Sequence, residues 1–379
     1  MNRINLRLNN GCYCSEACRD VLTNFKGDFR LSLYTDENNE RLLDALSKFH
    51  AIPEANIILA NGSGPLLMRG LPMLVENRIR SSIVRTARHF AFGDGCPLVT
   101  PEMTYFKVPL GGRRKGLRIH FVKSVERDGR FLVDLAGLDA TLARRPAVVY
   151  IATPSNPNGT VVFDRNAMLE IIARRSDSLF WMDEAYVELL EPSLASEVEL
   201  IRHVPKFENL IVSRSFSFAY GLAGARIGFA AAPEWAAKIL ASKESTYRLG
   251  VLQEELALAA LKSSKEHLAF ITKYMRTERE KIEAALSSFE GIQVFASDTH
   301  QVLGRFTDER QGKLLADGLA AHGISIRHFE NEAKSVMPKL ASFFRLCVGR
   351  PEENQAFIDR LGDVLGKRSE APHALRAVS

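Results

Sequence analysis

The sequence lacks the features that mark membrane, exported and nucleic-acid-binding proteins. No apolar run approaches the roughly 18 residues of a membrane-spanning helix, and the opening MNRINLRLNN contains no apolar segment of an export signal. The net charge is only +5 over 379 residues, with basic and acidic residues interleaved. Such a distribution suits small anionic ligands better than a nucleic-acid backbone. We therefore expect a cytoplasmic protein that engages neither membranes nor nucleic acids.

Cysteine is scarce, and its arrangement argues against two common uses. The count of five is odd, which does not favour a disulfide framework. Three of the five crowd into CYCSEAC, as Cys12, Cys14 and Cys18. A tetrahedral structural metal site needs four ligands, usually as two separated pairs, and no second pair is present. We expect reduced, partly buried thiols and no metal.

Apolar runs of strand length are what the sequence does have. Runs rich in Val, Ile, Leu and Phe alternate with helical periodicity, and they occupy 56–62, 147–154, 178–186, 209–217 and 225–233. Continuous runs of this kind are typical of strands that helices bury on both faces. The pattern predicts an α/β fold, a three-layer sandwich around a mostly parallel sheet.

The pattern changes after about residue 250. A long amphipathic stretch over 253–289 leads into shorter strand-like and helical segments, which predict a smaller α+β domain. We expect an N-terminal arm over 1–35 that joins the small domain, a large domain over 36–255, the small domain over 256–366, and a flexible polar tail over 367–379.

Polar residues follow the apolar runs. Ligands of open α/β sheets bind at the carboxyl ends of the strands, so these residues are the candidates for a site: Gly62, Ser63, Gly64, Asn156, Asp183, Tyr186, Ser215, Ser217 and Arg226. The Gly-Ser turn presents backbone N–H groups at a helix start, which is the usual way to hold a phosphate. Each signal is weak alone, because such turns and strand-end aspartates are common caps. Their joint order is much more specific.

That order resembles the class I/II aminotransferases among the fold-type I pyridoxal-phosphate enzymes, in the branch of histidinol-phosphate aminotransferase and threonine-phosphate decarboxylase. TPSNPNG (153–159) is similar to the family's asparagine-proline motif, and MDEAY (182–186) to its aspartate-tyrosine motif. SFSFAYGLAGARIG (215–228) looks like its serine-x-lysine loop with the glycine and arginine that follow. The resemblance runs from about residue 31 to 350. It implies a homodimer with the site at the interface, and a large domain that binds pyridoxal phosphate.

The resemblance also implies a role for each cofactor-binding residue. Asp183 faces the pyridine nitrogen and keeps the ring protonated, while Asn156 and Tyr186 bond the ring's phenolic oxygen. The phosphate cup is formed at the helix start and the loop after the fourth apolar run, by Ser63, Gly64, Ser215, Ser217 and Arg226, the arginine contributing a charge-assisted contact. Tyr34 matches a tyrosine that one subunit lends to the phosphate of its neighbour.

Substrate contacts are implied near both ends of the chain. Arg345 matches the arginine that grips the substrate carboxylate, a task suited to a planar fork of donors, with Asn156 beside it. Tyr13 lies where relatives close a flap over the substrate, although a surface turn is the plainer interpretation.

Two positions depart from the family pattern. Phe218 stands where the family has the lysine that forms the Schiff base and shuttles the α-proton, and phenylalanine offers neither nucleophile nor proton. No other lysine lies between Lys206 and Lys238. Met103 occupies the position of an aromatic residue that stacks on the pyridine, and it holds a ring less rigidly.

Three hypotheses follow. In the first, an enzyme binds pyridoxal phosphate or pyridoxamine phosphate noncovalently and acts on an amino-acid or amino-phosphate substrate, with Tyr186, Tyr220 or Tyr247 transferring the proton. In the second, the chain is a non-catalytic subunit that forms a heterodimer with an intact relative. In the third, the pocket binds another anionic metabolite. An engineered replacement of a lysine by Phe218 is a variant of the first.

Overall fold

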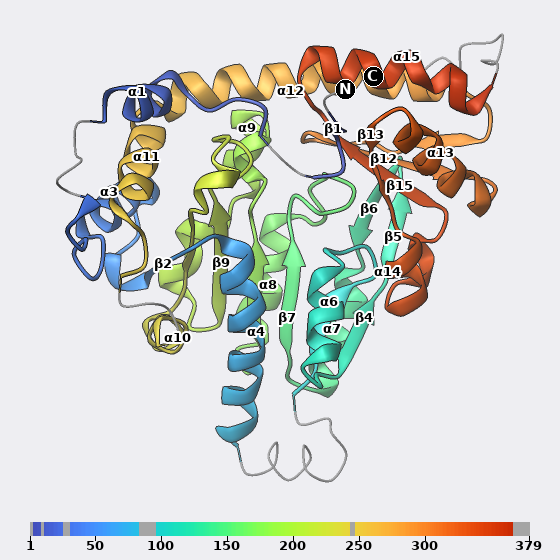
Figure 1. Ribbon diagram of the computed structural model, residues 1–379. Helices are drawn as coiled ribbons and strands as arrows, with labels where there is room; N and C mark the ends of the chain where they lie inside the picture. The colour runs from blue at the N-terminus through green and yellow to red at the C-terminus, as the bar shows by residue number, and fades with distance from the viewer. Residues whose placement is uncertain (1–2, 9–10, 26–30, 83–95, 243–246, 367–379) are drawn as a thin grey trace.

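The computed structural model describes residues 3–8, 11–25, 31–82, 96–242 and 247–366 (Figure 1). The tail predicted over 367–379 lies outside these residues. The domain boundaries at 35, 255 and 366 stay predictions.

A seven-stranded sheet forms the centre of the larger part of the described chain. In spatial order its strands are β2 (Ile57–Ala60), β10 (Gly228–Ala231), β9 (Leu210–Ser215), β8 (Leu179–Asp183), β7 (Val148–Ala152), β3 (Leu98–Pro101) and β4 (Ile119–Val122). Only β10 runs antiparallel to its neighbours in this sheet. The prediction of an α/β fold with a mostly parallel sheet is confirmed. The apolar runs also located five of these strands, while β3 and β4 were missed.

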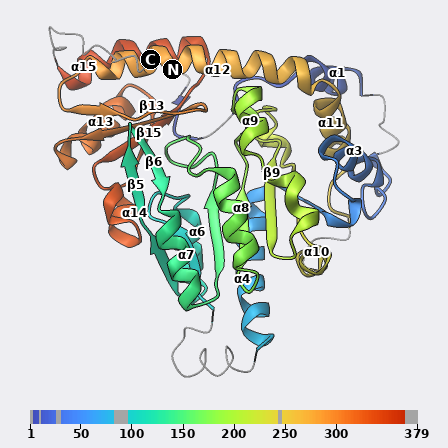
Figure 2. The same cartoon turned by 180° about the vertical axis from the view of Figure 1, so that it is seen from behind.

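Helices cover both faces of this sheet (Figures 1 and 2). On one face lie α4 (Ser63–Arg80), α6 (Lys107–Arg114) and α10 (Glu234–Ala241); on the other lie α7 (Leu135–Arg144) and α8 (Arg165–Arg174). Strand β8 shows how the sequence divides between the layers. Its side chains alternate, so Trp181 packs with the α4 layer and Met182 with the α8 layer. Asp183 therefore points to the α4 side.

A four-stranded antiparallel sheet organises the smaller part, in the order β11 (Ile292–Val294), β12 (Gln301–Phe306), β15 (Phe343–Cys347) and β14 (Arg327–His328). Near it lie α13 (Glu309–Ala321), α14 (Glu330–Ser335) and α15 (Pro351–Leu365). The N-terminal strand β1 (Ile4–Asn5) pairs with β13 (Ile324–Ser325). These two strands form a sheet of their own, which attaches the start of the chain to the smaller part of the molecule.

Several shorter elements complete the described chain. They are the hairpin β5 (Ser124–Arg127) and β6 (Arg130–Val133), helices α1 (Glu16–Asn24), α3 (Glu40–His50) and α9 (Pro192–Val198), and the 3₁₀ turns Glu54–Asn56, Val187–Leu189, Ile201–Lys206, Ala223–Ala225 and Pro338–Leu340. Within the described residues, no helix is both long and apolar enough to span a bilayer.

The long amphipathic stretch is two helices, α11 (Val251–Lys262) and α12 (Ser264–Ser287). The break falls at Ser263, whose hydroxyl donates to the carbonyl of Ala259 at 2.9 Å and lies 2.9 Å from the hydroxyl of Ser15, with which it is hydrogen-bonded. Serine side chains compete with helical backbone bonds in this way. Since Ser15 caps α1, the N-terminal arm is fixed at this break.

Candidate active site

A cavity of about 350 Å³ lies at the carboxyl ends of β7, β8 and β9, where Ala152, Asp183 and Ser215 end their strands. It gathers most of the predicted site residues: Ser63, Gly64, Asn156, Asp183, Tyr186, Ser215, Ser217, Phe218, Arg226 and Arg345. Asn156, Asp183 and Ser217 meet here because parallel strands end at one edge of the sheet, and Arg345 comes from the smaller sheet.

Asp183 is held in the cavity wall by two hydroxyl groups. Tyr150 donates to its Oδ2 at 3.0 Å and Ser213 to its Oδ1 at 2.9 Å. Burial raises the pKa of the Asp183 carboxyl, and the bonds from Ser213 and Tyr150 act in the opposite direction. No ion pair joins Asp183 to a cation of the described chain. The carboxylate is therefore oriented by its neighbours and still able to bind a protonated heteroatom.

Arg345 and Asn156 form a second polar group in the wall. Nη1 of Arg345 donates to Oδ1 of Asn156 at 2.8 Å, and Nη2 donates to the carbonyl of Arg7 at 2.7 Å. Nδ2 of Asn156 donates to the hydroxyl of Tyr186 at 3.0 Å. Arg345 is buried, and its Nε has no partner among the described residues. A buried guanidinium held in this way presents a fixed fork to an anion.

The start of α4 and Arg226 approach each other closely at the other predicted anion site. Gly62, which precedes α4, has a φ of +96°, and a Cβ there would lie 2.4 Å from Nη2 of Arg226. A Cβ on Gly228 would lie 2.2 Å from the backbone nitrogen of Ser63. Only glycine permits this approach. The result is a helix N-terminus, a guanidinium and the hydroxyls of Ser215 and Ser217 around one space, a donor set that fits a phosphate.

Phe218, which we predicted to stand in place of the family's lysine, lines the cavity with an aromatic ring. Its ring stacks on Tyr186 with centroids 4.5 Å apart and an interplanar angle of 30°. The ring centroids of Phe218 and His300 are 6.1 Å apart. His300 is fully buried, and neither of its ring nitrogens has a partner in the described chain. Burial lowers the pKa of His300 to about 3. This wall offers neither an amine nor a titrating base at neutral pH.

Five predicted residues do not line the cavity. Met103 packs in a core cluster with Phe131 and Phe295, and its backbone nitrogen donates to the hydroxyl of Ser124, so its stacking on a ring stays a prediction. Tyr105 and Phe106 line the cavity instead. The turn after β3 thus points the aromatic residues, not the methionine, at the ligand space.

The remaining tyrosines are also placed elsewhere. Tyr220 is buried against Phe216. Tyr34 and Tyr247 stack on each other with centroids 4.3 Å apart, and 81% of Tyr34 is exposed. Tyr13 packs edge-on against Tyr274. Tyr186 is therefore the one predicted proton-transfer candidate that lines the cavity.

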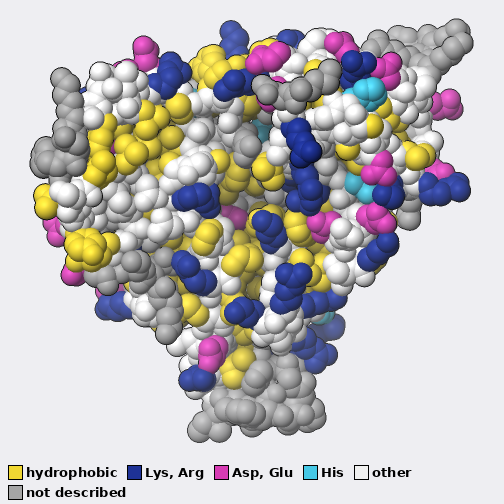
Figure 3. Space-filling view, in the orientation of Figure 1, with side chains coloured by type: hydrophobic (Ala, Val, Ile, Leu, Met, Phe, Trp, Pro, Cys, Tyr) yellow, Lys and Arg dark blue, Asp and Glu magenta, His cyan; other side chains and the backbone are white. Residues whose placement is uncertain are grey.

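Three cations that the sequence motifs did not indicate also line the cavity: Arg7, Lys107 and Arg327. Arg327 pairs with Arg345 across β14 and β15, and its guanidinium lies 5.0 Å from the ring centroid of Phe106. Asp183 is the only acidic residue among the described lining residues. Figure 3 shows Lys and Arg side chains spread over the middle of the molecular face, where acidic side chains are few. The cavity is thus strongly cationic.

The sequence model for aminotransferases of class I and II matches residues 79–361. The chain belongs to this family of fold-type I pyridoxal-phosphate enzymes. The histidinol-phosphate aminotransferase of Roseiflexus castenholzii is 32% identical to it over 342 residues, which are 88% of this chain and 81% of the relative.

Solved aminotransferase-family structures share the fold. The histidinol-phosphate aminotransferase from Sinorhizobium meliloti, in complex with pyridoxal-5'-phosphate, superposes with a TM-score of 0.79 at 24% identity, covering 96% of this chain and 91% of that one. The L-threonine-O-3-phosphate decarboxylase from Porphyromonas gingivalis gives a TM-score of 0.73 at 20% identity, with 96% and 100% covered.

Proposed function

We propose that this aminotransferase-family protein is a cytoplasmic homodimer that binds pyridoxal phosphate or pyridoxamine phosphate noncovalently and acts on an amino-acid or amino-phosphate substrate. The observation that carries the proposal is that Asp183, Arg226 and Arg345 line one cavity. The lysine-based reaction of the family has no counterpart at Phe218.

Residues that line the cavity would hold the coenzyme. The start of α4, Ser215, Ser217 and Arg226 would hold the phosphate, and Asp183 would bond the ring nitrogen. Tyr105 supplies an aromatic wall. When bound, the coenzyme supplies an electron sink for bonds at an amino-acid α-carbon.

The substrate end favours a ligand with a second anionic group. Arg345 offers its guanidinium to one anion, and Arg7 and Arg327 bring two further cations to the same cavity. A phosphorylated amine or amino acid matches this charge, and it agrees with the names of the relatives, histidinol-phosphate aminotransferase and threonine-phosphate decarboxylase. A neutral amino acid leaves cations of the cavity without a partner.

Tyr186 is the proposed proton donor of the cavity. Burial raises the pKa of its hydroxyl, and the nearby Arg345 charge acts in the opposite direction. A hydroxyl kept protonated can donate to a developing oxyanion or carbanion but does not serve as a base at neutral pH.

Coenzyme binding tests the proposal. We expect that pyridoxal phosphate and pyridoxamine phosphate both bind in equilibrium dialysis and perturb the near-ultraviolet difference spectrum. Binding by neither coenzyme contradicts the proposal. Phe218→Lys is the matched variant: we expect a yellow adduct that survives dialysis, and transamination of an added amino acid.

A second candidate is the non-catalytic partner subunit, and the position of Tyr34 favours it. This ring is 81% exposed and does not line its own cavity, so it is available to a neighbouring subunit. Copurification from the native source with an intact aminotransferase supports this function. Recovery of a self-associated chain alone contradicts it.

A further inference from the structure

Lys107 brings an amine to the rim of the cavity. It is the first residue of α6, it is exposed, and it lines the cavity two residues after Tyr105. Its Nζ lies 6.0 Å from the centroid of the Tyr105 ring. Among the described residues that line the cavity, no other side chain carries a primary amine.

The ammonium group of Lys107 is not committed to another role. No hydrogen bond or ion pair joins it to a described residue, whereas Lys339, near the same segment, is bonded to Glu102 at 2.7 Å. A lysine side chain is a flexible four-carbon stem with a compact head group. Rotation of this stem moves the amine across the edge of the Tyr105 ring.

Tyr105 lines the cavity together with Lys107 at its rim and with the two charged residues Asp183 and Arg345. Burial raises the pKa of its hydroxyl to about 12, the Asp183 charge raises it further, and the Arg345 charge lowers it. The amine of Lys107 therefore lies over a ring that lines the cavity with Asp183 and Arg345.

We propose that Lys107 supplies the amine of this cavity, capturing carbonyl ligands in place of the lysine that Phe218 replaces. The neutral amine nitrogen bonds to the carbonyl carbon, and the carbonyl oxygen leaves as water with the two amine hydrogens, so that nothing is oxidised or reduced. The capture is reversible and adds to the noncovalent contacts of the proposed function, on which it rests.

Reductive trapping tests the inference. The whole protein is mixed with one equivalent of pyridoxal phosphate, reduced with borohydride, digested and analysed by mass spectrometry. We expect the phosphopyridoxyl group mainly on Lys107. The label on this peptide disappears in Lys107→Arg, which keeps the charge, and falls strongly in Arg226→Gln, which weakens the phosphate cup. Lys115→Arg is the matched control, since Lys115 follows the same helix and does not line the cavity.

Pyridoxamine phosphate separates the inference from the proposed function, because it has no carbonyl group to trap. If both coenzymes bind in dialysis but the label is spread over surface lysines, or sits mainly on a lysine other than Lys107, the inference is wrong and the proposed function stands. If neither coenzyme binds and Lys107 carries no excess label, both are wrong. Labelling of Lys107 that is unchanged in Arg226→Gln also overturns the inference, because it reflects surface reactivity.

Discussion

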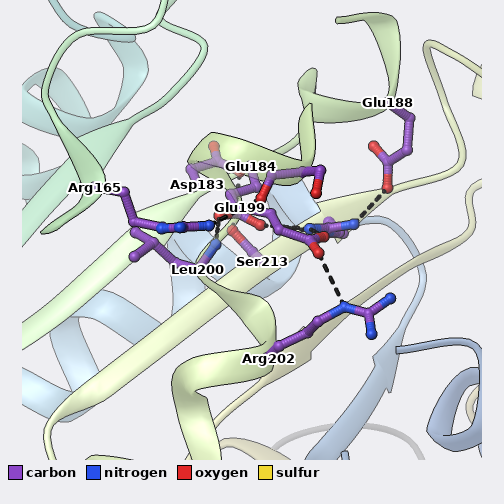
Figure 4. Close-up of polar contacts among 10 residues, drawn as sticks. Arg165, Asp183, Glu184, Glu188, Glu199, Leu200, Arg202 and Ser213 are labelled. Atoms are coloured by element: carbon purple, nitrogen blue, oxygen red, sulfur yellow. Dashed lines mark hydrogen bonds and ion pairs between the residues drawn. The ribbon is translucent and has the colours of Figure 1, made fainter. Parts of the chain in front are cut away.

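Asp183 and Glu184 are consecutive carboxylates that face opposite sides of the central sheet. Asp183 faces the cavity and is bonded by the hydroxyls of Tyr150 and Ser213. Glu184 faces the other side, where Arg214 donates to its Oε2 at 3.0 Å and 2.8 Å (Figure 4). Burial raises the pKa of both carboxyls. One carboxylate has a cation of the protein as its partner, and the other does not.

The residues around Glu184 and Asp183 show the same difference in ion pairing. Arg214 also contacts Glu199 at 2.9 Å and Glu188 at 3.3 Å, which gives a buried ionic network around one guanidinium. On the cavity side, Asp183 makes no ion pair with a described residue, and the Nε of the buried Arg345 has no partner there. Buried polar groups are normally bonded. The comparison indicates that the network serves folding, and that the cavity keeps its polar groups for a ligand.

Removing the centre of the network should have the largest effect. Arg214→Met leaves up to three carboxylates without their common partner, and we expect a loss of about 3–5 kcal/mol in the free energy of unfolding, measured by urea titration. Arg202→Met, at an exposed ion pair with Glu199, is the control and should cost less than about 1 kcal/mol. Equal losses of unfolding free energy in Arg214→Met and Arg202→Met would contradict a special folding role for the buried network.

Removing a cavity cation should change ligand binding more than folding. Arg226→Gln loses a charge-assisted contact worth about 1.5–3 kcal/mol, so the dissociation constant for pyridoxal phosphate should rise roughly 10- to 150-fold, as measured by equilibrium dialysis. Arg174→Gln, at an exposed pair with Asp139, should leave this constant unchanged. An Arg226 variant with normal affinity contradicts the assignment of the phosphate cup.

The unpartnered His300 should make the protein acid-sensitive. Its folded pKa is about 3 and that of the unfolded chain is about 6.5, so the native state binds fewer protons between these values. Stability is therefore full above pH 6.5 and falls as the pH decreases, by about 2 kcal/mol between pH 6.5 and 5. His300→Asn cannot titrate and should reduce the acid-induced loss by that amount. Urea titrations at pH 6.5 and 5 measure the free energy of unfolding of both proteins. If the parent and His300→Asn lose the same amount between these pH values, the role of His300 is refuted.

Neutralising the cavity carboxylate should have the smallest effect on folding. Asp183→Asn removes a buried charge that has no cation as partner, while its hydroxyl neighbours can reorient. We expect unfolding free energy within about 1 kcal/mol of the parent, measured as for Arg214→Met, together with weaker coenzyme binding. A loss as large as that of Arg214→Met would show that Asp183 is a folding residue.

The strand-end residues could be predicted because an apolar run of strand length defines where its carboxyl end lies. Asp183 and Asn156 were predicted in this way, Arg226 was predicted at the start of the next run, and all three line the cavity. Arg7 and Lys107 could not be predicted, since they follow no such run and reach the cavity through an arm and a helix start. Met103 was predicted from the family motif, and such a motif does not determine how the segment between β3 and α6 orients its side chains.

The break at Ser263 illustrates a second limit. The amphipathic pattern continues through it, and only the contact with Ser15, 248 residues away, shows why the helix ends. Local periodicity carries no information on such distant partners. The same holds for Tyr150 and Ser213, whose bonds to Asp183 depend on strand register.

The bond from Arg345 to the carbonyl of Arg7 joins the segment after the first strand to β15, one of the last elements. During synthesis on the ribosome the residues of the proposed phosphate cup have all emerged by residue 228, but the proposed substrate grip must wait more than a hundred residues for β15. A nascent chain thus acquires its two anion sites at different times, and clipping the first few residues removes part of the later one while sparing the earlier.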